Sequence, residues 1–356
     1  MIKKKIKRIA VKYASPLIYY SGIYKLASPI YSGIGSILMF HRVCKEETRD
    51  RIGGVAGMEV TPEYLENTIQ LLKKNDYEII SLERLSEILK GSNIERKFVA
   101  FTFDDGYADN FNLAYPILKK YNVPFTIYVT TSFPEKTAIL WWYLLEDLVL
   151  GNQEIVFEWD GKEKLFSCKT LMEKEKAYGE IHEFIKQEKG KAPLKRLEAV
   201  FKGRLDDLYK KTNELALTWE QIRELSNDPL ATIAAHTVNH YPLSKLPGDE
   251  AEWEIIESKK ILESQTNKKV EHFSYPFGTI DEAGKREFEI ARDCGFETVA
   301  TTRIGNIFPE HGRYNECLPR IHMNEKRFGS EAKYLSLWLS GFYPMIVNNL
   351  KRVITI

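Results

Sequence analysis

Short apolar runs alternate with amphipathic helical patterns along most of this chain of 356 residues. One complete unit comprises an apolar run at 98–101, a helical pattern over 108–121 and a second apolar run at 125–129. A strand, a helix and another apolar strand in this order favour a parallel sheet with helices outside it. We therefore predict an α/β fold, and a chain of this length can bury the core of one α/β barrel.

Two adjacent carboxylates, Asp104 and Asp105, end the first of these apolar runs and are followed at once by Gly106. Where a strand passes into a turn, both side chains can lean toward one cavity. There one carboxylate can hold a metal ion while the other accepts a proton. The same three residues are also common turn chemistry, so the pair alone does not decide between a site and a turn.

A histidine pair, His236 and His240, follows another apolar run at 231–235. On a helical turn this spacing puts both rings on one face, with Cβ atoms roughly 5–6 Å apart. Together with Asp105 they would give two imidazoles and one carboxylate. Such a set leaves a fourth position open for water, which is typical of catalytic rather than structural zinc.

These two motifs resemble those of the polysaccharide deacetylases, carbohydrate esterase family 4 with its NodB-homology domain. Residues 102–106 are similar to the first motif of the family and 236–240 to the second, and the resemblance covers about 36–133 and 216–323. It implies a single, distorted or incomplete (β/α) barrel that removes acetyl groups from N-acetylated sugars. It also implies that Asp104 is the general base and that Asp105, His236 and His240 hold one divalent metal ion, with zinc expected.

A third motif is partly present at 273–278, which resembles the Arg-Pro-Pro-Tyr-Gly segment of the family. By this likeness the backbone N–H of Phe277 would stabilise the oxyanion, and a backbone donor needs no particular side chain. Ser274 stands where the family has the arginine that orients the base, and Arg320 is our candidate to replace that arginine. The fourth motif of the family, an Asp with a Trp, has no convincing match.

His41, which follows an apolar run at 37–40, is the predicted general acid. This segment resembles the circularly permuted branch of the family, in which the acid histidine comes first in the chain. His41 can reach the site only if the barrel closes its first strand against its last. His322 is the alternative acid, whereas His182, His272 and His311 are expected to be surface or supporting residues.

Composition indicates which binding partners and which cellular compartment to expect for this protein. The formal net charge is +1 and the pI is about 7.6, which gives no indication of a nucleic-acid partner. Four cysteines, Cys44, Cys168, Cys294 and Cys317, lack CxxC spacing. In a chain of this length they imply no disulfide framework. Free thiols in the cytoplasm are the simpler expectation.

The barrel is expected to consist of 32–133 and 217–330, interrupted by an insertion at 134–216. The insertion begins with an apolar helix near Trp141 and continues with a hairpin that turns at Asp160 and Gly161. A stretch over 170–210 rich in Lys and Glu then reads as helical. We expect the insertion to cover the rim of the site and contribute to substrate choice; a solvated decoration without a catalytic role is the alternative.

The two ends of the chain differ from the rest. Residues 1–31 begin with six Lys and Arg among the first twelve positions and contain no acidic residue; the first is Glu46. Apolar residues at helical spacing predict an amphipathic helix that ends at Pro16, and residues 1–15 could bind an anionic membrane at its inner face. The apolar C-terminal segment, 331–356, is expected to pack against the barrel or to form a second interfacial patch.

The leading functional hypothesis is therefore a hydrolase that acts on a carbon–nitrogen bond other than a peptide bond. Its substrate would be an N-acetylated sugar in a polysaccharide or a lipid-linked glycan. Two alternatives remain at this point. One keeps the site and makes the enzyme an O-acetyl esterase. The other, suggested by the missing arginine and fourth motif, is a non-catalytic, membrane-associated protein that binds glycans.

Overall fold

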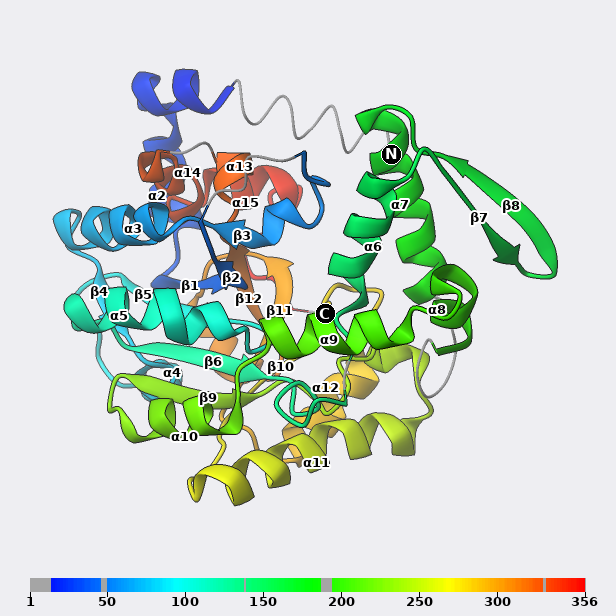
Figure 1. The fold of residues 1–356 in the computed structure, drawn as a ribbon. Coiled ribbons are helices and arrows are strands. Elements are labelled where there is room, and N and C mark those ends of the chain that lie inside the picture. The colour runs from blue at the N-terminus through cyan, green and yellow to red at the C-terminus, as the bar shows by residue number, and fades with distance from the viewer. Residues whose placement is uncertain (1–13, 46–49, 138, 187–193, 329–330, 356) are drawn as a thin grey trace.

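A computed structural model describes residues 14–45, 50–137, 139–186, 194–328 and 331–355, and these form a parallel (β/α) barrel (Figure 1). In the first three barrel strands all side chains are buried, which is why their sequences are almost continuously apolar. The barrel strands, in chain order, are β1 (Gly35–Phe40), β5 (Phe98–Phe103), β6 (Phe125–Val129), β9 (Ala231–Ala235), β10 (His272–Ser274), β11 (Thr298–Ile304) and β12 (Leu318–His322).

The barrel is closed by its first strand. β1 pairs in parallel with β5 along its whole length, from Gly35 beside Phe98 to Phe40 beside Phe103. Its other edge pairs with β12, where Met39 lies beside His322. Seven strands thus form a ring, and β4 (Glu78–Ile80) adds to the first half of β5 from outside. The predicted contact between the first and last strands is confirmed, and the barrel has one strand fewer than the eight of a complete (β/α) barrel.

Helices cover the outside of the barrel, and their first residues follow from the sequence. Thr61, Ser81 and Thr218 cap three of them by accepting a backbone N–H with the side chain. The predicted helix over 108–121 contains a π-helical segment, η3 (Asn110–Ala114). The outer helices are α3 (Pro62–Lys74), α4 (Leu82–Leu89), α5 (Tyr115–Lys120), α10 (Trp219–Asn227), α11 (Gly248–Thr266) and α12 (Lys285–Asp293).

Shorter elements connect these layers. A two-stranded parallel sheet formed by β2 and β3 lies next to the carboxyl end of β1. The short elements are β2 (Arg42–Val43), β3 (Glu59–Val60), η1 (Ile23–Ala27), α2 (Ser28–Tyr31), η2 (Ala56–Met58), η4 (Leu243–Lys245), η5 (Pro309–Arg313), α13 (Glu325–Phe328), η6 (Ala332–Leu335), α14 (Ser336–Leu339) and α15 (Phe342–Val347).

The segment between β6 and α10 packs around an apolar cluster of its own. The predicted hairpin is present, and the stretch predicted to be helical over 170–210 contains α7, α8 and part of α9. Arg51 joins this segment to the barrel side, since its guanidinium binds Glu146 of α6 at 3.0 Å and Glu59 at 2.7 Å. The elements are α6 (Trp141–Gly151), β7 (Glu154–Trp159), β8 (Lys162–Ser167), α7 (Leu171–Lys186), α8 (Leu194–Phe201) and α9 (Leu205–Leu215).

The terminal segments pack against each other and the barrel. The predicted basic helix falls mainly on residues 1–13, which lie outside the described residues. Residues 14–21 are helical, so the prediction that Pro16 ends the helix is wrong. Packing holds this helix past Pro16, because Ser15 bonds the hydroxyl of Tyr343 and the Tyr19 ring packs on Tyr334. No helix within the described ranges is long and apolar enough to cross a membrane.

Candidate metal centre and active site

The barrel brings the residues that the sequence singles out to the carboxyl ends of its strands. His41 directly follows β1, Asp104 and Asp105 follow β5, and His236 follows β9. The ends of β1 and β5 are joined directly, because the Asp104 N–H donates to the Phe40 carbonyl at 2.9 Å. Parallel strands end at the same edge of a sheet, which is why residues far apart in the sequence meet here.

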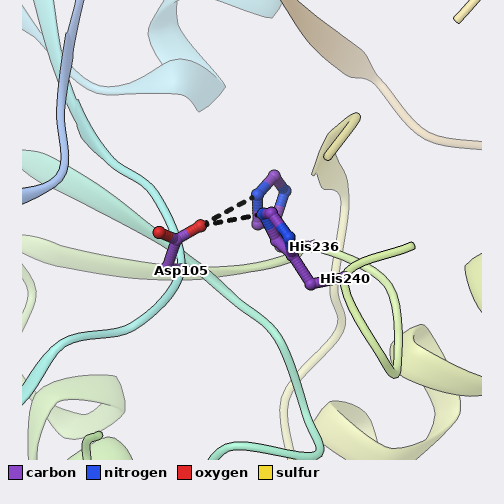
Figure 2. A group of neighbouring side chains, drawn as sticks. All are labelled: Asp105, His236 and His240. Atoms are coloured by element: carbon purple, nitrogen blue, oxygen red, sulfur yellow. Dashed lines mark ion pairs between the residues drawn. The ribbon is translucent and has the colours of Figure 1, made fainter. Parts of the chain in front are cut away.

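Asp105, His236 and His240 form a compact group of potential metal ligands (Figure 2). Asp105 Oδ1 lies 3.4 Å from Nε2 of His236 and 3.1 Å from Nε2 of His240. One ligand atom from each residue lies within 4.8 Å of the other two. Two neutral imidazoles and a carboxylate on one side of an ion match the ligand set of a catalytic zinc site.

The local chemistry fits a cation at this position. Asp105 Oδ1 is buried and has no hydrogen-bond donor among the residues that the structure describes, an arrangement that is costly unless a cation satisfies it. Burial would raise the pKa of Asp105, but His240 and His236 outweigh it and hold that pKa well below its usual value. His236 Nδ1 lies 2.7 Å from the Ser274 carbonyl. Donation to that oxygen fixes the tautomer in which Nε2 is free to bind a metal.

The segment that carries the two histidines is a loop, not the helical turn predicted from their spacing. Glu254 of α11 explains the difference. Its carboxylate accepts the backbone N–H groups of Val238 at 3.0 Å and Asn239 at 2.8 Å, which would otherwise serve a helical turn. Even so, the rings of His236 and His240 lie close, with centroids 5.0 Å apart.

Backbone strain is concentrated at this site. Asp105, Thr237, His240 and Phe277 all have positive φ, between 58° and 75°. Left-handed conformations of residues other than glycine cost of order 1–3 kcal/mol each and persist only where the surroundings enforce them. The fold therefore holds the loops after β5, β9 and β10 in geometries that the residues would not adopt alone.

Arg320 pairs with Asp104 in the interior of the barrel. Its guanidinium donates to both carboxylate oxygens, at 2.6 and 2.7 Å, and to the Ser274 hydroxyl at 2.8 Å. Burial would raise the pKa of Asp104, but the charge and hydrogen bonds of Arg320 lower it. Asp104 is therefore an ionised carboxylate with a fixed orientation. Arg320 approaches from β12, beside the serine that stands where the family has its arginine.

His41 and His322 lie side by side, with ring centroids 5.3 Å apart. The Asn110 amide donates to the His41 carbonyl at 2.8 Å and so fixes the backbone after β1. Burial lowers the pKa of His41, while the charges of Asp105 and Asp104 act in the opposite direction. These charges place His41 in the electrostatic field of the two carboxylates. Its Nδ1 is buried without a hydrogen-bond partner among the described residues.

Phe277 lies in the loop after β10, and its backbone is fixed by β11. The Thr302 hydroxyl donates to the Phe277 carbonyl at 2.5 Å, and the Thr302 N–H donates to the Gly278 carbonyl at 3.0 Å. A Cβ atom at Gly278 would lie 2.8 Å from the Thr302 nitrogen, so only glycine fits there. In the part of the chain that the structure describes, the backbone N–H of Phe277 has no hydrogen-bond acceptor.

Aromatic side chains surround His240, and one of them comes from α6. The Trp142 ring lies 5.4 Å from His240, the Phe277 ring 4.9 Å and the Phe133 ring 6.4 Å, between centroids. The indole N–H of Trp142 donates to the Tyr107 hydroxyl at 3.2 Å. Neither Trp142 nor Glu254 lies in a sequence motif, so a role at the site could not be predicted for either. Trp142 reaches His240 from α6, and Glu254 reaches the histidine loop from α11.

The other histidines support the fold. His272 is buried against the Thr298 hydroxyl at 2.8 Å and lies 3.5 Å from Glu83. His311 is buried too, where it accepts the Phe308 N–H at 2.9 Å. His182 packs on the Trp141 ring in the segment between β6 and α10. Of the two predicted positions, surface or supporting, His272 and His311 take the second, because both are buried and each bonds a polar group inside the molecule.

Comparisons with solved structures agree with the fold. Deacetylase PplD of Streptococcus pyogenes, solved in complex with acetate, superimposes with a TM-score of 0.57 at 20% identity, over 86% of this chain and 97% of its own. IcaB of Ammonifex degensii gives a TM-score of 0.52 at 16% identity, over 86% and 96% of the two chains. A de-N-acetylase of Aggregatibacter actinomycetemcomitans gives 0.51 at 19% identity, over 81% and 94%.

Sequence comparison gives the family. YxkH of Bacillus subtilis strain 168, a polysaccharide deacetylase homologue, is 22% identical over 295 residues, which span 83% of this chain and 73% of YxkH. The sequence pattern of the family described as polysaccharide deacetylase matches residues 91–299, more than half of the chain. That range contains both acidic residues after β5 and both histidines of the candidate metal centre. The chain belongs to the polysaccharide deacetylase family.

Proposed function

We propose that this deacetylase is a metal-dependent hydrolase that removes the acetyl group from an N-acetylated sugar of a polysaccharide or lipid-linked glycan. The observation that carries the proposal is the pairing of two separate devices at one end of the barrel. Asp105, His236 and His240 converge as an open ligand set, and Asp104 is held ionised beside them by Arg320. Two of the similar structures are a de-N-acetylase and a deacetylase in complex with acetate, and both are consistent with this chemistry.

Zinc is the proposed metal, because imidazole and carboxylate ligands in a three-residue open set suit it. When bound, it would polarise the acetyl carbonyl and lower the pKa of the attacking water. Asp104 would accept the proton of that water, and Arg320 keeps its two oxygens ionised and oriented for this task.

The remaining steps use groups on the neighbouring strands. The N–H of Phe277 would donate to the oxyanion that forms as the water attacks. His41, at the end of β1, would protonate the departing amine; burial lowers its pKa, and the charges of Asp105 and Asp104 favour its protonated form. The aromatic rings of Trp142, Phe133 and Phe277 would form an apolar wall against the sugar or the acetyl methyl group.

One reason for the non-catalytic alternative is removed by the geometry of Arg320. That hypothesis was based partly on the missing arginine of the third motif, yet a guanidinium from β12 occupies the space beside Ser274 and Asp104. The O-acetyl esterase alternative uses the same residues. Acetate release from N-acetyl and O-acetyl glycans, measured with the same preparation, separates the two.

The roles of the adjacent acids provide the decisive test. Asp104→Asn should abolish acetate release and retain metal, because Asp104 faces Arg320 and not the histidines. Asp105→Asn should lose both, since it removes the charged ligand. Metal per chain is measured by mass spectrometry after dialysis against a chelator and reloading with zinc. Equal metal content in the two variants would contradict the assigned roles.

A further inference from the structure

Exposed apolar side chains are concentrated where the two ends of the chain meet. We call this patch the terminal surface; it consists of Leu17, Tyr20, Ile23, Leu26, Ile30, Ile346, Val347 and Leu350. These are eight of the fifteen large apolar residues that are exposed in the described ranges. Leu17 and Leu26 are 76% and 77% exposed, so neither belongs to the core. Contiguous apolar patches of this kind mark interaction sites.

The two segments form one surface because they are packed together. The Ser15 hydroxyl bonds the Tyr343 hydroxyl at 2.8 Å, and both η1 and α2 contact α15. A Cβ atom at Gly341 would lie 2.1 Å from the Tyr31 carbonyl, so the chain passes very close to α2 at this point. In Figure 1 the blue N-terminal helices accordingly lie beside α14 and α15.

Charge is distributed unevenly between the terminal surface and the rest of the molecule. Residues 1–31 and 340–356 contain nine Lys and Arg side chains and no Asp or Glu. The remaining residues contain 42 basic and 50 acidic side chains. The two terminal segments that carry the exposed apolar residues are therefore basic, whereas the rest of the chain has a net negative charge.

We propose that the terminal surface binds an anionic lipid bilayer. Its apolar side chains would enter the headgroup region while basic residues of the two terminal segments contact anionic lipids. A second copy of the chain is a less suitable partner, because these two segments carry nine positive charges and no negative one in each copy. The terminal surface consists only of described residues, follows in the chain the membrane segment predicted at residues 1–15, and does not depend on the proposed metal chemistry.

The experiment is co-sedimentation of the full chain with vesicles. Vesicles of equal parts phosphatidylglycerol and phosphatidylcholine should bind the protein at least tenfold more tightly than pure phosphatidylcholine, and added salt should weaken the binding. Leu17→Gln with Leu26→Gln should reduce partitioning about tenfold, since two side chains no longer enter the bilayer. Deletion of residues 1–15, which removes six of the nine basic residues, should weaken binding to anionic vesicles only.

A matched control is available in the segment between β6 and α10. Leu165 and Met172 are 58% and 70% exposed, and their change to Gln should leave partitioning unaltered. Thermal unfolding of each variant checks that the fold is retained. Equal binding to neutral and anionic vesicles, or equal loss in both double variants, would overturn the proposal. So would a monomer–dimer shift by light scattering caused by Leu17→Gln with Leu26→Gln, because the surface would then join two copies.

Discussion

Arg320 reaches Asp104 from β12, the last strand of the barrel. Ser274 stands at the end of β10, where the family has its arginine, and its side chain is too short to orient Asp104 as an arginine would. From the sequence, Arg320 was the candidate for this role because Ser274 left open which residue orients Asp104. The structure adds that Ser274 still takes part. Its hydroxyl accepts from Arg320 and its carbonyl lies within hydrogen-bonding distance of His236 Nδ1, so one residue contacts both the base and the metal centre.

The first prediction at the residue scale concerns the general acid. His41→Ala should lower acetate release by roughly 10²–10⁴-fold with metal retained, because the leaving amine would lose its proton donor. His322→Ala should have a much smaller effect, although the two rings lie 5.3 Å apart. Turnover and metal content are measured on both variants. The reverse ranking would assign the acid to β12.

The second prediction concerns Glu254, which holds the loop between the two histidine ligands. Glu254→Gln keeps one acceptor oxygen for the N–H groups of Val238 and Asn239, but it sets an amide NH₂ against the Asn239 side-chain amide, which donates to the other carboxylate oxygen at 2.6 Å. Zinc affinity should fall about 10–100-fold, as is typical when the support of a metal ligand is lost. Competition with a chromogenic chelator measures it.

The control for this change lies on the same helix. Glu257→Gln alters a carboxylate that pairs with Lys260 at the surface, 3.7 Å away, and should leave zinc affinity unchanged. Similar zinc affinities for the two variants would show that Glu254 does not position the ligands.

The residues of the candidate metal centre were predicted from the sequence, but how they are held was not. The spacing of His236 and His240 suggested a helical turn, and the residues instead form a loop with positive φ at Thr237 and His240. A four-residue spacing is compatible with both geometries. The choice depends on Glu254, whose carboxylate lies on a helix that begins later in the chain, and no local pattern contains that information.

At the scale of elements, α6 belongs to the apolar cluster of its segment and is also tied to the barrel side by a buried ion pair. Glu146 of α6 accepts the guanidinium of Arg51 and the N–H of Ile52, and its side chain is fully buried. Trp142, one turn earlier on the same helix, lies against His240. Residues one turn apart share a face of a helix, so the Glu146–Arg51 ion pair lies next to the aromatic ring that contacts His240 and helps to position it.

This arrangement predicts the effect of removing Arg51. Arg51→Met should destabilise the protein by about 3–5 kcal/mol, because Glu146 would remain buried without its cation, while Glu59 would keep only Arg42 at 3.4 Å. Hydrogen exchange should accelerate first in 141–151, and KM for the glycan should rise while metal content is retained. Arg84→Met is the matched control, since its pair with Glu87 is exposed and should contribute less than about 1 kcal/mol. Equal destabilisation of the two variants would contradict the role given to the buried pair.

Sequence patterns predicted this segment in part. The hairpin was predicted from alternating residues and the Asp160–Gly161 turn, and the helical pattern over 170–210 was largely correct. How these elements pack was not predictable, because the Arg51–Glu146 contact joins residues separated by almost a hundred positions. Local periodicity indicates which face of a helix is apolar, not which element covers it.

For the whole molecule, Asn306 joins the two ends of the chain to the barrel. It accepts the hydroxyl of Ser36 at 2.9 Å, and its amide donates to the carbonyls of Tyr31, Trp338 and Leu339. All three carbonyls belong to elements that pack at the N-terminal end of β1. One buried side chain thus links the first strand, the segment before it and α14.

Asn306→Ala should therefore lower the free energy of unfolding by about 3 kcal/mol, since several buried polar groups lose their partner at once. The peptide bonds near residues 31–35 should become more sensitive to limited proteolysis, while metal binding persists. Asn315→Ala, which removes one bond to the Glu297 carbonyl, should cost about 1 kcal/mol. Urea unfolding of the two variants distinguishes a multiple link from an ordinary hydrogen bond.

The pairing of β1 with both β5 and β12 has a consequence for the newly made chain. β1 leaves the ribosome first, yet one of its edges has no neighbour until β12 has been synthesised. Until then the strand has an open apolar edge, the kind of edge that other chains can join. His41 follows β1 and Arg320 lies on β12, so these two parts of the candidate site also come together only in this late event. A nascent chain of this protein should be protected by chaperones until its final strand is released, and it should have no acid–base activity before that moment.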